Sequence, residues 1–201
     1  MLKDEKNSNF VKNQNPYNKY KTIINNDILK LYYQFTHLKN IYRQGWLTSL
    51  LGMKYENKVE SVADHSWSVT MLAMSIIEKY DLDFDIEKCM KLAMIHELGE
   101  IYAGDFIPNQ VTKEEKHKLE ERAVDELLNS IEFDNDFKEL WLEYENKKSP
   151  EADFIKQVDK LECILQAGSY GLNSKYIKGE DVYKITQDNE LPLCFREDNE
   201  R

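Results

Sequence analysis

The sequence predicts an all-α protein, and three observations support this class. Hydrophobic residues make up 41% of the chain and charged residues 32%, with only 7 glycines and 4 prolines, a mixture typical of helical proteins. Apolar residues recur every three or four positions through most of the chain, and capping motifs precede several of these stretches. No strand pattern and no internal repeat is expected. The length of 201 residues suits one domain with a hydrophobic core.

The first 25 residues are rich in Asn and Lys and have few periodic apolar positions. We therefore expect residues 1–25 to form a flexible N-terminal arm. A helix is expected from Asn26 or Asp27, because apolar residues then recur at helical spacing as far as Leu38. The next stretch, RQGWLTSLLGMKYENKVE, contains two glycines and a turn-like ENK, so we expect a loop there.

Two helices are expected in the middle of the chain. The first begins at Ser61, because S-V-A-D places an acid three residues after a serine cap, and it should extend to about Tyr80. Asp85 caps the second helix, which is expected to run from Ile86 to about Tyr102.

Three more helices are expected in the C-terminal half. The capping box T-K-E-E, which begins at Thr112, predicts a helix directly after it. A short helix is expected over residues 134–146. The motif S-P-E, which begins at Ser149, supplies a cap, a first-turn proline and an acid at the positive end of a helix. That helix is expected to extend to about Ala167.

The apolar periodicity weakens after Gly171, where only a short helix near residues 181–186 is expected. Residues 26–190 are therefore expected to form one domain, followed by a tail at 191–201. No window approaches the roughly 18 apolar residues of a membrane span, and the N-terminus lacks the apolar region of a signal peptide. The three cysteines form no CxxC pair, which suits a reducing compartment, so we expect a cytoplasmic protein.

The charge of the chain limits its possible partners. A net charge of −10 and a pI near 5.0 exclude an electrostatic surface for nucleic acid polymers. An anionic small substrate is still compatible, because one bound cation and one arginine can set the local field.

Three polar residues, His65, His96 and Asp159, lie on or beside the apolar stripes of three separate helices. Burying a neutral polar group without a partner costs roughly 2–7 kcal/mol, and burying a charge costs more. One shared divalent ion would satisfy all three, and Glu97, about 100° around the helix from His96, could join from the flank. Such ligands suit Mn, Fe, Co or Zn. Taken singly, each residue is more often satisfied in a core or on a surface, and spacing alone does not show that they meet.

Several motifs together carry a family resemblance. They are A-D-H at 63–65, H-E-L-G-E-I-Y-A-G-D at 96–105, K-Q-V-D-K-L-E at 156–162, R-Q-G-W at 43–46 and K-E-E-K-H at 113–117. In order and spacing they resemble the HD-domain metal-dependent phosphohydrolases, most closely the 5′-deoxynucleotidase-like branch. The resemblance implies a helical bundle around one divalent ion at its centre. It also implies hydrolysis of a nucleoside monophosphate to nucleoside and phosphate, usually by a homodimer.

The same resemblance implies the metal ligands His65, His96, Glu97 and Asp159. The chain departs from the family at the second motif, which is usually His-Asp, because position 97 is Glu. One extra methylene moves the carboxylate by about 1.5 Å, against a tolerance of about 0.5 Å in a productive site. We expect this difference to affect the identity of the bound metal and the catalytic rate more than the fold. A second departure is G-S-Y-G at 168–171, where relatives place acids around the tyrosine.

The resemblance also assigns roles beside the ion. Glu100 is the candidate for positioning or deprotonating the attacking water, and Asp105 for orienting substrate hydroxyls, holding a water or protonating the leaving group. Arg43 offers a planar fork for phosphate, and Trp46 is a candidate for lining the sugar or base pocket. Ordinary alternatives exist for each: a helix-end acid, a loop cap, a surface arginine and an interior tryptophan. Lys116 could assist phosphate binding or be a solvated lysine.

The leading hypothesis is thus a metal-dependent phosphomonoesterase that removes the 5′-phosphate of (deoxy)nucleoside monophosphates. One alternative is hydrolysis of another phosphoester, such as a cyclic or polyphosphorylated nucleotide. Another is a catalytically weakened nucleotide-binding protein, in which Glu97 has degraded the site. An HD-type di-iron oxygenase would need further histidine ligands, and only His37 and His117 remain for that role.

Overall fold

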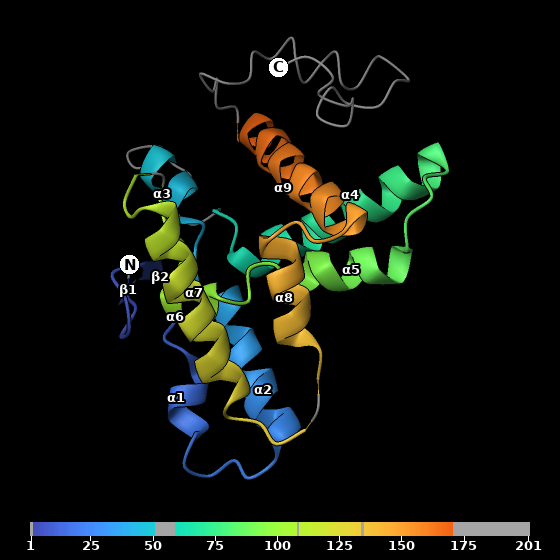
Figure 1. Cartoon of the computed structure of the whole chain (residues 1–201). Helices are drawn as coiled ribbons and strands as arrows, with labels where there is room; N and C mark the ends of the chain where they lie inside the picture. Colours follow the sequence, from blue (N-terminus) through green and yellow to red (C-terminus); the bar gives the residue numbers. More distant parts are fainter. Residues whose placement is uncertain (1, 51–58, 108, 134, 171–201) are drawn as a thin grey trace. The chain divides into compact units, whose positions relative to one another are not determined.

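The computed structural model describes residues 2–50, 59–107, 109–133 and 135–170 of the chain (Figure 1). The chain divides into two compact units. The first unit comprises Met1–Ser66 and Ile95–Trp141, and the second unit comprises Trp67–Met94 and Leu142–Arg201. The described elements are overwhelmingly helical, which confirms the predicted all-α class. Among the described residues, no helix is both long enough and apolar enough to cross a membrane.

The first unit begins with a pair of short antiparallel strands and continues with helices. Its elements before residue 60 are β1 (Leu2–Lys3), β2 (Phe10–Val11), α1 (Pro16–Tyr20), α2 (Asp27–Phe35), the 3₁₀ helix η1 (Thr36–Lys39) and α3 (Gln44–Leu50). Two further helices, α6 (Glu100–Ala103) and α7 (Lys113–Leu128), pack against each other. Ile41, Leu47, Leu127 and Trp141 are among the fully buried side chains of this unit.

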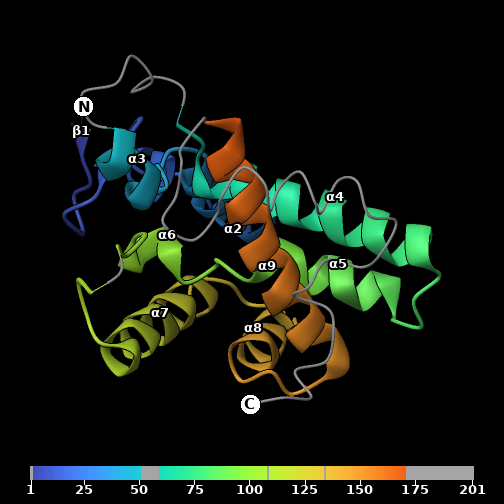
Figure 2. The same ribbon diagram turned by 90° about the horizontal axis from the view of Figure 1, so that it is seen from above.

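Three helices, α4 (Val62–Tyr80), α5 (Ile86–Ile95) and α8 (Phe137–Glu145), contribute residues to both units, and α9 (Pro150–Ser169) belongs to the second. In both views, α4 and α5 run side by side and are joined by a tight connection (Figures 1 and 2). Asp81 in that connection has a φ of 52°, which lets the chain reverse directly after α4. Within the second unit, Phe84 stacks on Phe154 of α9 at 4.6 Å between ring centroids.

The capping motifs have the expected geometry. Asp64 Oδ2 accepts from the Ser61 N–H at 2.8 Å, and Thr112 and Glu115 form both hydrogen bonds of a capping box at α7. Ser149 Oγ accepts from the Ala152 N–H at 3.1 Å at the start of α9. Local side-chain chemistry is therefore sufficient to fix these three helix starts.

Three local expectations were wrong. No strand was expected, but β1 and β2 form a short antiparallel pair within residues 2–25, where Asp and Asn side chains bond to the backbone and fix turns. The expected loop after Arg43 contains α3, whose first N–H is capped by the distant Asp105 carboxylate. The helix expected over 86–102 is interrupted between Ile95 and Glu100, where hydrogen bonds span three residues instead of four. The helix near 181–186 and the tail at 191–201 lie outside the described residues.

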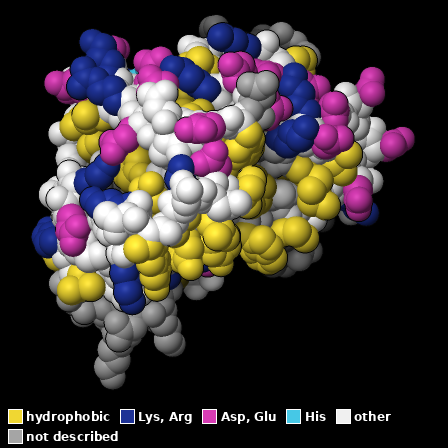
Figure 3. Space-filling model, turned by 90° about the horizontal axis from the view of Figure 1, so that it is seen from below, with side chains coloured by type: hydrophobic (Ala, Val, Ile, Leu, Met, Phe, Trp, Pro, Cys, Tyr) yellow, Lys and Arg dark blue, Asp and Glu magenta, His cyan; other side chains and the backbone are white. Residues whose placement is uncertain are grey.

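Charged side chains of both signs are interspersed on the face shown in Figure 3, between hydrophobic groups that reach the surface. No continuous basic surface is visible on that face, as expected for a chain with a net charge of −10.

Candidate metal and phosphate site

The site in the first unit is built around two buried imidazoles. His65 lies in the first turn of α4, and His96 directly follows α5. Their Nε2 atoms are 3.4 Å apart, and the two rings meet edge to face with centroids 5.3 Å apart. The structure therefore brings together two of the predicted metal ligands, which are 31 residues apart in the sequence.

Glu97 joins this pair despite its extra methylene. Its Oε1 atom lies 3.6 Å from Nε2 of His96 and 3.8 Å from Nε2 of His65. Because the helix is interrupted after Ile95, Glu97 follows a tighter turn than an α-helix, and its carboxylate reaches the same side as both imidazoles. The longer side chain of Glu97 therefore places its carboxylate within 4 Å of both imidazoles.

This donor set fits a divalent ion of the Mn, Fe, Co or Zn type. Two nitrogen ligands bound at about 2.0–2.1 Å to a tetrahedral ion lie about 3.4 Å apart, which matches the observed Nε2 separation. A carboxylate oxygen within 4 Å of both nitrogens completes a set that such ions accept. The residues present therefore suit the ion that the sequence motifs imply.

Arg43 connects the imidazole–carboxylate cluster to Asp105. Its Nη1 atom donates to Glu97 Oε1 at 2.9 Å and lies 3.6 Å from Asp105 Oδ1. The backbone of Arg43 is fixed by a hydrogen bond from its N–H to the Glu60 carbonyl at 3.1 Å. Asp105 in turn accepts from the backbone N–H of Gln44 at the start of α3. Arg43 is therefore held inside the site and is not a surface arginine.

Glu100 lies on α6 and is completely buried. Among the described residues, neither of its carboxylate oxygens has a hydrogen-bond partner. Burial raises the pKa of Glu100 well above its usual range, and the negative charges of Glu97 and Asp105 raise it further. The positive charges of Lys116 and Arg43 partly offset this increase in the pKa of Glu100. A buried carboxyl group without a partner, next to ionisable residues, is typical of a catalytic acid or base.

Two residues of α7 extend the site. Carboxylate oxygens of Glu120, Glu97 and Glu100 all lie within 4.8 Å of one another, and Lys116 Nζ lies 3.2 Å from Glu120 Oε1. Burial alone lowers the pKa of Lys116, but these three carboxylates outweigh it and raise the pKa above its usual range. Lys116 therefore places a positive charge beside the acidic cluster, with 39% of its side chain exposed.

Glu120 was not foreseen from the sequence, although its spacing of four from Lys116 on a helix was visible. Its place depends on the close approach of α6 and α7. A Cβ atom at Gly99 would lie only 2.6 Å from the Cβ of Glu120. Glycine at this position therefore lets α6 approach the helix that carries Glu120.

The remaining candidates make the following contacts within their own units. Trp46 Nε1 donates to Glu60 Oε1 at 2.7 Å. His37 pairs with Asp4, and the ring of His117 stacks on Trp141 at 5.5 Å, so both histidines have structural contacts. Asp159 lies on α9 in the second unit, where its Oδ2 accepts from the hydroxyl group of Tyr144 at 2.9 Å.

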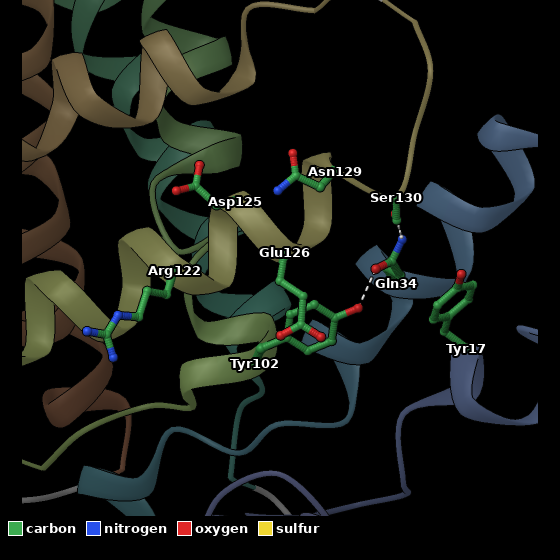
Figure 4. Close-up of a pocket in the computed structure, with 8 residues that line it drawn as sticks. All are labelled: Tyr17, Gln34, Tyr102, Arg122, Asp125, Glu126, Asn129 and Ser130. Carbon is green, nitrogen blue, oxygen red and sulfur yellow. Dashed lines mark hydrogen bonds between the residues drawn. The ribbon is translucent and has the colours of Figure 1, made fainter.

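A cavity of about 590 Å³ lies elsewhere in the first unit, and it is lined by residues of α1, α2, α6 and α7 (Figure 4). The hydroxyl group of Tyr102 donates to Gln34 Oε1, and Gln34 Nε2 donates to Ser130 Oγ at 2.8 Å. This chain of hydrogen bonds fixes Tyr102, and with it the end of α6.

Comparison with known proteins gives a consistent family. The HD domain matches residues 35–192. The 5′-deoxynucleotidase HDDC2 of Bos taurus is 38% identical over 155 residues, which cover 74% of this chain and 71% of that protein.

Two solved structures extend this likeness to the fold. The PH0347 protein from Pyrococcus horikoshii is 29% identical with a TM-score of 0.61, over 78% of this chain and 85% of that chain. A predicted metal-dependent phosphohydrolase from Magnetospirillum magnetotacticum is 27% identical with a TM-score of 0.58, over 69% of this chain and 68% of that chain. The resemblance of the sequence motifs is thereby confirmed: the chain belongs to the HD-domain family, in the branch that contains 5′-deoxynucleotidase HDDC2.

Proposed function

We propose that this protein is a metal-dependent phosphomonoesterase that removes the 5′-phosphate from deoxynucleoside monophosphates and related nucleotides. The observation that carries the proposal is the cluster of His65, His96 and Glu97, with the buried carboxylate of Glu100 beside it. The curated relative named 5′-deoxynucleotidase supports the choice of substrate.

The residues of the chain divide into two tasks. His65, His96, Glu97 and Asp159 would hold the divalent ion, the last of these by its match to the family motif. When bound, the ion supplies Lewis-acid polarisation of the phosphoryl group. Arg43 would bind two phosphate oxygens through its guanidinium group.

Glu100 would take the proton of the water that attacks phosphorus while the bond from phosphorus to the 5′-oxygen breaks, and it would return that proton to the leaving 5′-oxygen, so that nucleoside and phosphate are released. The observation that favours Glu100 for this role is that both of its carboxylate oxygens are buried without a hydrogen-bond partner among the described residues, beside Glu97. Both Asp105 oxygens face donors, Arg43 and the Gln44 N–H, which favours orientation of substrate over proton donation. Trp46 remains a candidate for contact with the sugar or base.

Two further features belong to the proposal. Cys89 is buried and Cys163 half-buried, and neither forms a disulfide among the described residues, which suits a reducing, cytoplasmic environment. A homodimer is expected from the family resemblance, and light scattering of the purified protein tests it.

The function is tested by phosphate release from a panel of deoxynucleoside and ribonucleoside monophosphates, cyclic nucleotides and triphosphates. The assay is run with Mn, Co, Fe or Zn. We expect hydrolysis of deoxynucleoside 5′-monophosphates and a loss of about 10²–10⁴ in kcat for Glu100→Gln. Glu114→Gln is the matched control, because Glu114 is an exposed acid on α7, and its kcat should stay within about twofold of the parent.

Preferential hydrolysis of cyclic or polyphosphorylated nucleotides would redirect the proposal to that substrate class. Binding of nucleotide without hydrolysis under every metal would instead favour the weakened binding protein. A Glu100→Gln variant as active as Glu114→Gln would remove Glu100 from the mechanism.

A further inference from the structure

The loop between β1 and β2 is closed by its own side chains. Asp4 Oδ1 accepts from the backbone N–H groups of Lys6 at 2.8 Å and Asn7 at 3.3 Å. Asn7 Oδ1 accepts from the Asn9 N–H at 2.9 Å, and the Asp4 N–H donates to the Asn9 carbonyl at 2.9 Å. Such bonds from Asp and Asn side chains to the backbone fix a turn without a hydrophobic core. We refer to residues 4–9 as the Asp4–Asn9 loop.

This loop is attached to the first unit by charged contacts. Asp4 Oδ2 lies 2.8 Å from Nε2 of His37, and both side chains are buried. Lys6 Nζ lies 3.6 Å from the centroid of the Tyr102 ring and pairs with Glu126. Tyr102 and Glu126 lie next to each other on the side of the cavity shown in Figure 4. The loop is thus tied to η1, α6 and α7 at once.

Two asparagines of the loop reach the backbone next to the candidate catalytic acid. Asn7 Nδ2 donates to the Tyr102 carbonyl at 3.3 Å, and Asn9 Nδ2 donates to the Asp105 carbonyl at 3.1 Å. Gly104 lies between these carbonyls with a φ of 81°, and a Cβ atom there would lie 2.2 Å from Asn9 Oδ1. The loop therefore packs directly on the backbone that presents Asp105.

Phe10, the residue after this loop, binds the side chain of Gln44, and the backbone of Gln44 binds Asp105. The Gln44 side chain accepts from the Phe10 N–H at 2.9 Å and donates to the Phe10 carbonyl at 2.9 Å. The Gln44 backbone N–H donates to the Asp105 carboxylate. The N-terminal hairpin, which consists of β1, the Asp4–Asn9 loop and β2, thus contacts the main chain of Asp105 directly. It reaches the Asp105 carboxylate through Gln44.

We propose that the Asp4–Asn9 loop is a positioning element of the active site, and that Asn9 keeps the Asp105 carboxylate in place beside Arg43. Asn9 touches no reacting atom and acts through Asp105 alone. The role of Asp105 in catalysis rests on the proposed function, whereas the control of its position by Asn9 does not.

The test compares the full-length protein with Asn9→Ala, Asn9→Asp and Ser8→Ala. Asn9→Asp keeps the size of the side chain but places an acceptor opposite the Asp105 carbonyl. Ser8→Ala is the matched control, because Ser8 is the exposed neighbour in the same loop. Amide hydrogen exchange is measured at Gln44 and at residues 103–106, and kcat, KM and Mn²⁺ affinity are measured with a deoxynucleoside monophosphate. Thermal unfolding checks that each variant is folded.

Both Asn9 variants should exchange these amides about tenfold faster or more, because the hydrogen bonds of Asp105 are weakened. Their kcat should fall by about 10–100-fold, as expected for a misplaced catalytic group, while KM and Mn²⁺ affinity should stay within about twofold. Ser8→Ala should match the parent.

Exchange rates in both Asn9 variants equal to those in Ser8→Ala would overturn the proposal, whatever the activity. Faster exchange with unchanged kcat would overturn it too, since the position of Asp105 would not matter for the rate. If the parent itself releases no phosphate, the proposed function fails, and the exchange data still decide whether Asn9 positions Asp105.

Discussion

At the scale of single residues, Glu97 occupies the position where the motif resemblance predicts Asp, and the structure shows which groups the longer acid contacts. Its carboxylate lies within 4 Å of two imidazoles and also accepts from Arg43 at 2.9 Å. The longer side chain can do both because the turn that carries it is tighter than an α-helix. Glu97 therefore links the candidate metal ligands to the candidate phosphate clamp.

We predict that Glu97→Asp weakens the site. Shortening the side chain withdraws the carboxylate by about 1.5 Å, which lengthens its contacts with both imidazoles and with Arg43. The affinity for Mn²⁺, measured by titration calorimetry, should fall by about tenfold or more, and kcat should not rise. A variant that binds metal more tightly and turns over faster would show instead that Glu is the poorer ligand in this backbone.

The sequence was informative about residues whose chemistry conflicts with their surroundings. His65 and His96 could be proposed because an imidazole on an apolar stripe needs a partner, whereas Glu100 was proposed from the family resemblance. Glu120, Gln44 and Asn9 could not be proposed in this way. They are ordinary polar residues in ordinary local patterns, and only tertiary contacts bring them to the site.

At the scale of elements, helix starts could be predicted and helix interruptions could not. Ser61, Thr112 and Ser149 cap helices through contacts within four residues, so local sequence decides. After the interruption at Ile95, Gly99 packs against Glu120, 21 positions later, and α3 begins where the distant Asp105 carboxylate accepts its first N–H. Contacts at such separation leave no local pattern.

The structure of the N-terminal hairpin could not be predicted from local sequence either. Its Asn-rich composition suggested disorder, but the Asp and Asn side chains bond to the backbone and form turns. Its attachment depends on Asp4. Burial raises the pKa of Asp4, but hydrogen bonds from His37, Lys6 and Asn7 outweigh it, so the pKa lies below its usual value. An acid with a lowered pKa stabilises the folded state above its unfolded pKa, and this contribution is lost as the pH falls through the folded value.

We therefore predict a pH-dependent cost for Asp4→Asn. At pH 6.5 the variant should lose about 1.5–3 kcal/mol in the free energy of unfolding, the usual value of a hydrogen bond to a charged group. The loss should shrink once the pH falls below about 3.9, where the unfolded acid is also protonated. Urea unfolding at pH 6.5 and at a pH below about 3.9 measures the free energy of unfolding of the parent and the variant. Asp83→Asn is the control, because Asp83 is exposed. A cost that is unchanged or larger in acid would contradict the role given to Asp4.

At the scale of the whole molecule, composition and family motifs proved sufficient for class and family. The helical elements and the match of the HD domain over residues 35–192 both follow expectations drawn from periodicity and motif order. Because the chain has a net charge of −10, the binding of an anionic phosphate requires positive charge within the site. Phosphate must enter a site that already contains Glu97, Glu100, Asp105 and Glu120, so local positive charge from Arg43, Lys116 and a bound cation has to offset these acids.

The proposed activity requires a bound divalent ion, and titration calorimetry of the purified, metal-stripped protein with Mn²⁺ measures this binding. We expect one ion per chain for the parent and no detectable binding for His65→Asn or His96→Asn, with the folded state of each variant verified by circular dichroism. A parent that binds no divalent ion, or histidine variants that bind as tightly as the parent, would contradict this expectation.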